Sequence, residues 1–442
     1  MEKTFFRSVC ALAVPVALQS MLQSSFGIVD QIMIGQLGSV SIAGVGFAGK
    51  FSSIYSVVVS AVGAVAGIMM AQYLGQGNRR EVRRSFFVNL WLAAGLAGIF
   101  TVLSVCFPAQ LMGLYTKDAE TIRAASAYLV VTAATFLPMA GATMLSALLR
   151  CLEKASLPLG ASIAAALVNT GLNYLLIFGK SGFPALGAQG AGIATAISQW
   201  VNFLVMLALF LRYRESLAGT GTKPAPFRWR QYAGMLLPVL VCELLWSLGE
   251  NVYAAIYGHI GTQASAAMIL INPIQGLMTG ALCGLSQAAG VLVGKRLGSG
   301  EYDRAYAESK KLVWYGLAGS LILSAVIVVT RGWYVEIYQV EEAVKGLTQH
   351  ILLAYAAVAP FKVGNMILSG GVLRSGGRTE YVMGIDLVGT WGFGVPLGLL
   401  AAFTLELPIY WVYFILSLEE CIRFGIGGVI FRRKKWMRSL EG

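Results

Sequence analysis

Long apolar stretches recur along the chain and are separated by short polar breaks. An apolar stretch of about 20–25 residues is long enough to cross a bilayer as a helix. Twelve such spans are predicted, near 8–34, 44–74, 85–107, 121–149, 157–179, 187–211, 229–258, 264–294, 312–330, 347–373, 380–403 and 407–431. The pattern therefore predicts an all-α integral membrane protein, with tilted helices where a span exceeds about 25 residues.

Composition supports lipid as the solvent for most of the chain. Of the 442 residues, 57% are hydrophobic and 12% are charged, whereas a soluble domain carries roughly 25% charged residues. Met1 to Cys10 lacks a small-residue cleavage site, so we interpret it as the start of the first span. The six cysteines are scattered without a CxxC pair, and we expect no disulfide, no metal and no cofactor.

The basic residues fix an expected orientation. Of the 33 Lys and Arg residues, 26 fall on one set of alternate connections, with Arg423 counted in the C-terminal tail. The positive-inside rule then places both termini in the cytoplasm, in a multi-pass protein of the cell membrane. The same bias explains the net charge of +12. We therefore expect contact with anionic lipid and no nucleic-acid partner.

The second half of the chain repeats the first at one constant offset. Pro15 matches Pro238, Gly67 matches Gly290 and Gly77 matches Gly300. Six spans in each half make both halves enter the membrane from the same side, which defines a parallel repeat. We expect lobes at 1–211 and 231–442, joined by a cytoplasmic linker at 212–230. Two such lobes around a cleft suit alternating access in a transporter, and nothing in the sequence demands more than a monomer.

Ionisable residues inside spans are functional candidates, because each is costly to place in lipid. Asp30 follows Gln19 and Gln23 at helical spacing, so the three share one polar stripe. A polar stripe must face protein or a wet cavity. Two opposing effects decide whether a carboxyl group there is protonated. Desolvation favours the neutral acid, whereas nearby donors or cations favour the anion. The competing interpretation is that Asp30 only caps or hydrogen-bonds at the outer end of the helix.

Asn169 and Asn173 lie four residues apart on the fifth span and face one way. They are either part of a binding site or helix-to-helix hydrogen bonds. On the seventh span, one continuous face carries two acids and three aromatic rings: Glu243, Trp246, Glu250, Tyr253 and Tyr257. This face suits organic cations through charge and cation–π attraction. The open alternative is a structural ion pair of Glu243 or Glu250 with Lys362.

Two further sets of ionisable residues receive structural interpretations. Asp386, inside the eleventh span, is expected to make a gating or structural hydrogen bond. Glu419 and Glu420 are expected to pair with basic groups at the inner surface.

Four segments give the chain a resemblance to the MATE (multidrug and toxic compound extrusion) transporters. They are PVALQSMLQSSFGIVDQIMIGQLG from Pro15, MAQYLGQGN with its echo VGKRLGSGE, the pair LLRCLEK and VLRSGGRTE, and VNTGLNYLLIFG followed by GAQGAGIATAISQ. The resemblance covers nearly the whole chain. It implies twelve helices in two V-shaped lobes, and it is nearer to the DinF-like branch because Val363 stands where the sodium-driven NorM-like branch carries an acid.

The resemblance also implies site roles. Asp30 matches the coupling carboxylate of the N-terminal lobe, Gln23, Asn169, Asn173 and Thr195 accompany it, and the helix bends near Pro15. Asn173 stands where the family often has Asp, so fewer anionic oxygens are present for sodium. We expect an antiporter that exports small organic, mostly cationic amphipathic compounds, driven by protons in preference to sodium. The alternative within the superfamily is a flippase for lipid-linked precursors.

Other function classes lack their motifs. The chain has no HExxH, no P-loop and no GxSxG in a suitable context. We therefore expect neither an enzyme nor an ATP-driven pump.

Overall fold

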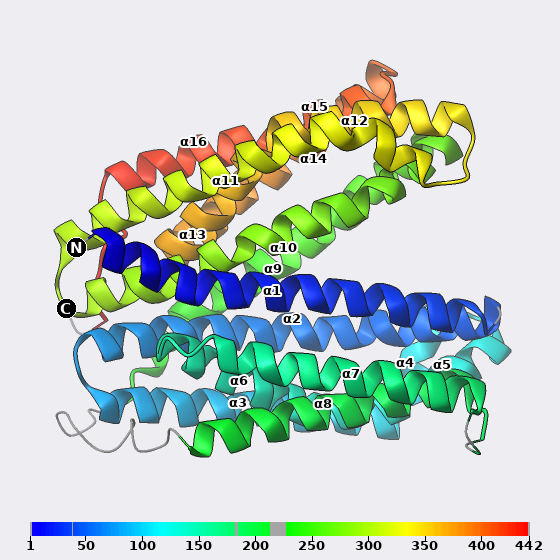
Figure 1. Cartoon of the computed structure of the whole chain (residues 1–442), viewed down its shortest axis with the longest axis horizontal. Coiled ribbons are helices and arrows are strands. Elements are labelled where there is room, and N and C mark those ends of the chain that lie inside the picture. The colour runs from blue at the N-terminus through cyan, green and yellow to red at the C-terminus, as the bar shows by residue number, and fades with distance from the viewer. Residues whose placement is uncertain (1, 38, 181, 183, 213–226, 441–442) are drawn as a thin grey trace. The chain divides into compact units, whose positions relative to one another are not determined.

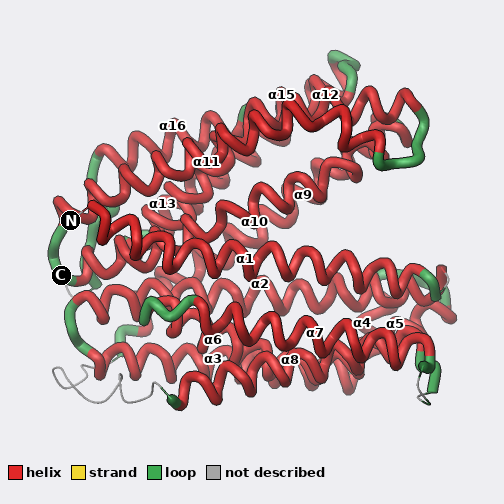
Figure 2. Tube along the Cα trace, in the orientation of Figure 1, coloured by secondary structure: helices red, strands yellow, loops and turns green. Residues whose placement is uncertain are grey.

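The computed structural model describes all residues except 1, 38, 181, 183, 213–226 and 441–442, and the side chains of 2–3, 26–29, 31 and 39 are also outside the description. The described part is 88% helix and contains no strand (Figure 2). A helix satisfies every backbone N–H and C=O within its own segment, which is the requirement that lipid imposes.

The first six spans match the predicted ones in order and closely in extent. Spans one to three are α1 Glu2–Gly35, α2 Ser39–Gly75 and α3 Arg79–Cys106. The short helix α4 Pro108–Gly113 precedes the fourth span, which consists of α5 Ala119–Thr132, η1 Ala133–Thr135 and α6 Phe136–Cys151. Spans five and six are α7 Ser156–Phe178 and α8 Gly187–Leu211.

The second six spans follow the same order. They are α9 Trp229–Ile260, α10 Thr262–Gly298, α11 Tyr302–Glu336, α12 Glu342–Asn365 with the π-helix η3 Met366–Leu373, the run α13 Thr379–Asp386, η4 Leu387–Gly394, α14 Val395–Leu399 and η5 Leu400–Thr404, and finally α15 Ile409–Ser417 with α16 Glu419–Arg432. The π-helical segments η3, η4 and η5 occur only in this half of the described chain. Such wide turns are frequent at functional sites.

Eleven helices of the described chain are long and apolar enough to cross a membrane. The predicted twelfth span, 407–431, falls below that length because it is divided at Leu418 into α15 and α16. The division places Glu419 and Glu420 in the first turn of α16, in the middle of the span.

The repeat is visible in the helix boundaries. The helix pairs α2 and α10, α3 and α11, α5 and α12, and α7 and α13 all begin at the offset that separates Pro15 from Pro238. Gly77 and Gly300 follow the ends of α2 and α10 with φ of 72° and 77°. This left-handed conformation is readily adopted only by glycine, so the sequence match of these two glycines reflects one shared turn.

The chain divides into two compact units. One comprises residues 18–225, which we call the N-lobe, and the other comprises residues 1–17 with 226–442, which we call the C-lobe. The predicted lobe ends, 211 and 231, fall at the end of α8 and just inside α9. Most of the predicted linker 212–230 lies outside the described residues.

The first half of α1 packs within the C-lobe although α1 is one continuous helix. A Cβ atom added to Gly284 of α10 would lie 1.9 Å from the Ala13 carbonyl oxygen. The Phe6 ring meets Tyr315 of α11 edge-on, with centroids 5.7 Å apart. The unit boundary at Ala17 and Leu18 comes just after Pro15, whose missing N–H weakens the helix locally. The hinge role of Pro15 stays a prediction.

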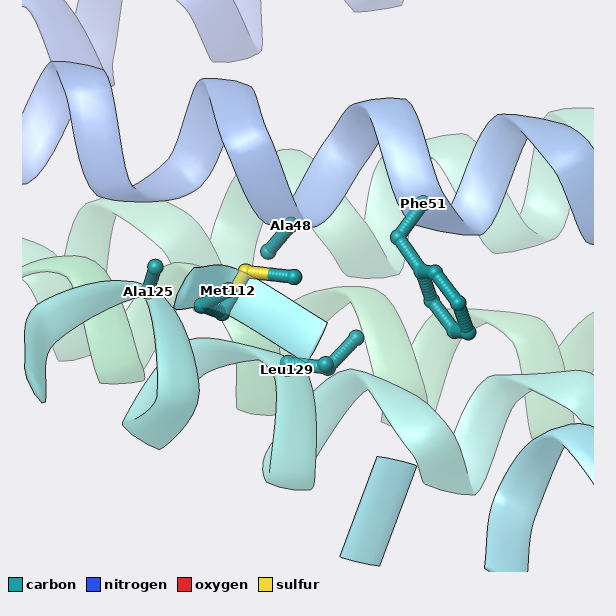
Figure 3. Packing of buried hydrophobic residues seen from close by; sticks show 5 residues of the cluster. All are labelled: Ala48, Phe51, Met112, Ala125 and Leu129. Carbon is teal, nitrogen blue, oxygen red and sulfur yellow. The ribbon is translucent and has the colours of Figure 1, made fainter. Parts of the chain in front are cut away.

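The N-lobe helices run along one another (Figure 1). Where α2, α4 and α5 meet, a cluster of small and large apolar side chains interlocks: Ala48, Phe51, Met112, Ala125 and Leu129 (Figure 3). Lipid offers apolar side chains no hydrophobic gain from associating, so shape complementarity of this kind stabilises the lobe. Gly44 contributes by letting α2 approach the backbone of Ala125.

Candidate coupling and substrate sites

A hydrogen-bonded cluster surrounds Asp30 inside the N-lobe. Asn173 of α7 donates from Nδ2 to Asp30 Oδ1 at 2.6 Å, and the same nitrogen lies 3.1 Å from Asn169 Oδ1. Asn173 is 1% exposed and Asn169 is 7% exposed. Within the described chain, Asp30 makes no ion pair with a base. Its carboxyl group therefore depends on amide donors and on its own proton.

The Asn169 amide distinguishes the two protonation states of Asp30. One amide atom of Asn169 lies 2.9 and 3.2 Å from the two Asp30 oxygens. With nitrogen at that place, Asn169 donates to an ionised carboxylate. With oxygen there, it accepts a hydrogen bond from a protonated carboxyl group. A rotation of this amide can thus accompany the gain or loss of one proton.

The sixth span completes the cluster. Asn169 Nδ2 lies 3.4 Å from Ser198 Oγ on α8 in the other amide orientation. Thr195, one turn earlier, donates its hydroxyl to the Ala191 carbonyl oxygen at 2.9 Å and lies near Tyr128 of α5, on which the charge of Asp30 acts. Gly192 makes room for the Tyr128 ring, because an added Cβ would lie 3.3 Å from it. Tyr128 and Ser198 were not predicted, since single polar residues in apolar spans are common.

Not every residue of the predicted stripe joins the cluster. Gln19 is half-buried and donates to Ser162 Oγ at 2.8 Å, which is a contact between α1 and α7. Gln23 is exposed and makes no hydrogen bond to the cluster among the described residues. Its part in ion coupling stays a prediction.

The C-lobe contains a cavity of about 350 Å³. Five of the six predicted substrate-binding residues line it: Trp246, Glu250, Tyr253, Tyr257 and Lys362. Tyr413 also lines the cavity, 6.4 Å from Tyr257 between ring centroids, and accepts a hydrogen bond from Gln275 at 2.9 Å. The cavity therefore combines aromatic faces with ionisable groups, a combination that suits organic ions.

Glu243, the sixth predicted residue, occupies a different place. It pairs with Arg374 at 3.3 Å and is not among the lining residues. The spacing of about 3.5 residues along the predicted face falls short of the roughly 3.6 residues per turn of an α-helix, so the face turns progressively around α9. Glu243 also lies about 10 Å from Glu250 along the helix axis, at about 1.5 Å per residue, and this axial distance separates it from the aromatic end of the face.

Lys362 makes no ion pair among the described residues, so neither predicted pairing with Glu243 or Glu250 is present. Its charge is influenced by Glu420, Glu250 and Glu419 together. A single cation shared among several acids stabilises all of them without neutralising any one.

Of the two glutamates predicted to pair with basic groups, Glu420 pairs with Arg423, whereas Glu419 makes no ion pair among the described residues. Both glutamates are buried, at 6% and 7% exposed, and all three residues line the cavity. Arg423 binds Asp386, and its Nη1 lies 3.5 Å from Glu420 Oε2. The expected structural hydrogen bond of Asp386 is therefore this ion pair. The sequence did not predict the break at Leu418, which divides this span into α15 and α16.

The chain has two lobes of six spans that are related by a parallel repeat. Each lobe holds ionisable groups in its lipid-spanning interior, and this arrangement is typical of secondary membrane transporters. The MatE family model matches the chain twice, over residues 15–175 and again over 238–400. The two matches begin at Pro15 and Pro238, the same two prolines that align the sequence repeat. The chain belongs to the MATE family of transporters, and it is a multi-pass membrane protein.

Individual relatives agree with this family. The chain is 26% identical to the multidrug resistance protein MdtK of Edwardsiella ictaluri, over 94% of this chain and 93% of that protein. It is 28% identical to the probable multidrug resistance protein NorM of Xanthomonas axonopodis pv. citri, over 89% and 86%. At this level of sequence identity the names of the relatives do not assign a branch of the family, so the DinF-like branch stays a prediction.

A solved structure supports the fold. A crystal structure of MATE in the bent conformation superimposes with a TM-score of 0.88, covering 98% of this chain and 96% of that chain at 16% identity. At this identity the similarity concerns the fold and not the site residues.

Proposed function

We propose that this protein is a secondary active exporter that exchanges protons for small organic compounds, mostly cationic and amphipathic. The single observation that carries the proposal is Asp30, a carboxyl group inside a lipid-spanning lobe whose described partners are amides and no base. Such a group can bind either a proton or an organic cation, but a bound cation favours loss of the proton.

The direction of transport and the class of compound rest on two supports. The relatives MdtK and NorM carry the description of multidrug resistance proteins. The C-lobe cavity presents Glu250 beside Trp246 and Tyr257, and aromatic faces with a carboxylate attract organic cations. A flippase for lipid-linked phosphates would need a mainly basic cavity, whereas three acids and two bases line this one.

Transport of a fluorescent organic cation into proteoliposomes under an imposed pH gradient tests the proposal. We expect Asp30→Asn to lower pH-driven uptake by at least about tenfold, because an amide does not gain or lose a proton by titration at this pH. Asp303→Asn is the matched control, since Asp303 is exposed in the first turn of α11. Unchanged uptake in Asp30→Asn would contradict the assignment, and uptake driven by sodium alone would replace the proton as the coupling ion.

A further inference from the structure

The interior of the C-lobe contains more acids than bases. Three carboxylates are less than one-tenth exposed: Asp386, Glu419 and Glu420. Two basic side chains, Lys362 and Arg423, line the cavity that these residues share or adjoin. If every group were ionised, the buried cluster would carry a net negative charge in surroundings of low dielectric constant. That state is costly unless a proton or another cation is bound.

The partners of each acid show which one lacks a base. Arg423 forms ion pairs with Asp386 and Glu420, and Glu420 also accepts a hydrogen bond from Asn365 at 2.7 Å. Glu419 instead accepts a hydrogen bond from the Tyr253 hydroxyl at 2.6 Å, and it makes no ion pair in the described part of the chain. Glu420 also lies close enough for its negative charge to act on Glu419.

We propose that Glu419 binds an exchangeable proton, and that it is a second coupling site, in the C-lobe, alongside Asp30. The inference rests on the proposed proton-coupled export. An organic cation that enters beside Glu250 brings one positive charge into the cavity. The proton of Glu419 then leaves to solvent, and the net charge of the cluster stays constant. Proton and cation thus compete through the net charge of one cluster of acids, although they bind beside different carboxylates.

The repeat supports this assignment independently. At the offset that aligns Pro15 with Pro238, Tyr253 occupies the position of Asp30. The first span of each lobe therefore contributes one side chain to a proton site, an acid in the N-lobe and a hydroxyl donor in the C-lobe. The sixth span contributes the partner: Thr195 and Ser198 of α8 belong to the Asp30 cluster, whereas Glu419 of α16 supplies the acid itself.

The Tyr253–Glu419 contact is closely enclosed. A Cβ atom added to Gly394 of η4 would lie 2.2 Å from both Glu419 Oε2 and the Tyr253 hydroxyl oxygen. A glycine at this place therefore allows the hydrogen bond to form. Charged and titratable groups surround Glu419 from several helices. Those that interact with it are Tyr253 and Tyr257 of α9, Lys362 of α12, and Glu420 and Arg423 of α16, while Glu250 of α9 and Tyr413 of α15 line the same cavity and Asp386 of α13 adjoins it through Arg423.

Proton release on binding distinguishes this proposal from the proposed function on which it rests. The full-length protein in detergent binds tetraphenylphosphonium, a permanent cation without a proton of its own, and calorimetry in buffers of different ionisation enthalpy counts the protons released. We expect Glu419→Gln to release up to one proton fewer per bound cation than the wild type. Asp30→Asn should still release protons, and the double variant should release none.

Each outcome has a separate meaning. Release that is unchanged in Glu419→Gln, or abolished by Asp30→Asn alone, would refute the second site and leave proton-coupled export intact. No release from the wild type at any pH would refute both proposals.

Two variants keep the test valid if Glu419→Gln folds poorly. Gly394→Ala and Tyr253→Phe both remove the hydrogen bond to Glu419 without substituting any carboxylate. Because that bond favours the ionised acid, we expect the pH midpoint of cation binding to rise by about one pH unit in each. Gly392→Ala, in the same π-helix, is the matched control, since its added Cβ would approach Val388 only to 3.9 Å. Midpoints equal to the wild type in both variants would overturn the proposal.

Discussion

The two lobes are built on one sequence repeat but arrange their ionisable groups differently. In the N-lobe, Asp30 is held by the amides of Asn173 and Asn169. In the C-lobe, three buried acids share Arg423 and Lys362 around a cavity. An amide cluster places one proton site without adding charge, whereas a charged network also supplies attraction for a ligand. Repeats that keep their backbone positions can therefore arrange their ionisable groups in two different ways.

Removing Arg423 should produce the largest effect, because it would leave Asp386 and Glu420 buried without their cation. Loss of one partner from a buried ion pair costs about 3–5 kcal/mol. We expect Arg423→Ala to lower the thermal unfolding midpoint in detergent strongly and to reduce expression. Arg432→Ala, at the exposed end of the same helix, is the control. Equal midpoints for the two variants would show that the network does not stabilise the C-lobe.

Asn173→Asp makes the N-lobe cluster resemble the charged C-lobe. A second carboxylate at the position now 2.6 Å from Asp30 would make one of the two acids hold its proton more tightly. We expect the pH optimum of transport in proteoliposomes to move upward by about one pH unit or more. A transport profile that keeps its optimum would indicate that Asn173 only joins two helices.

Lys362→Met should make the C-lobe cavity more attractive to cations. The change removes one positive charge among Glu250, Glu419 and Glu420. We expect the affinity for tetraphenylphosphonium to increase by about tenfold, measured as Kd in detergent. Lys310→Met serves as the control because Lys310 stacks on Tyr306 and does not line the cavity. A weaker affinity in Lys362→Met would mean that Lys362 holds the acids in their binding positions.

The smallest expected effect on stability concerns helix capping. Asp118 caps α5 through the Thr121 N–H at 2.9 Å, and its hydrogen bonds with Thr121 lower the pKa of Asp118. Its counterpart in the repeat, Glu341, makes no capping bond to α12. We expect Asp118→Ala to lower the unfolding midpoint by about 1–2 °C near neutral pH. The difference should vanish as the pH falls through the lowered pKa, and Glu341→Ala should leave the midpoint unchanged.

The N-lobe cluster was more predictable than the C-lobe cavity for a physical reason. Asp30, Asn169 and Asn173 stand out because polar residues in apolar spans must find partners inside the protein. The relevant spacing lies within straight helices, where the period of about 3.6 residues holds. In the C-lobe, the π-helical turns of η3 and η4 and the break at Leu418 shift the facing side chains. The sequence therefore did not place Glu419, Glu420 and Arg423 at the cavity, and Glu243 was misplaced for the separate reason of its position along α9.

The sequence by itself determined the helical membrane fold, the order of the spans, the repeat and the presence of rare intramembrane acids. These features follow from local composition and from the requirement that lipid-exposed backbone be satisfied within its own segment. Only the tertiary structure decided which acid meets which base. The pairing of Arg423 with Asp386, and of Glu419 with Tyr253, depends on contacts between helices distant in the sequence. Such contacts follow from packing, and no local pattern encodes them.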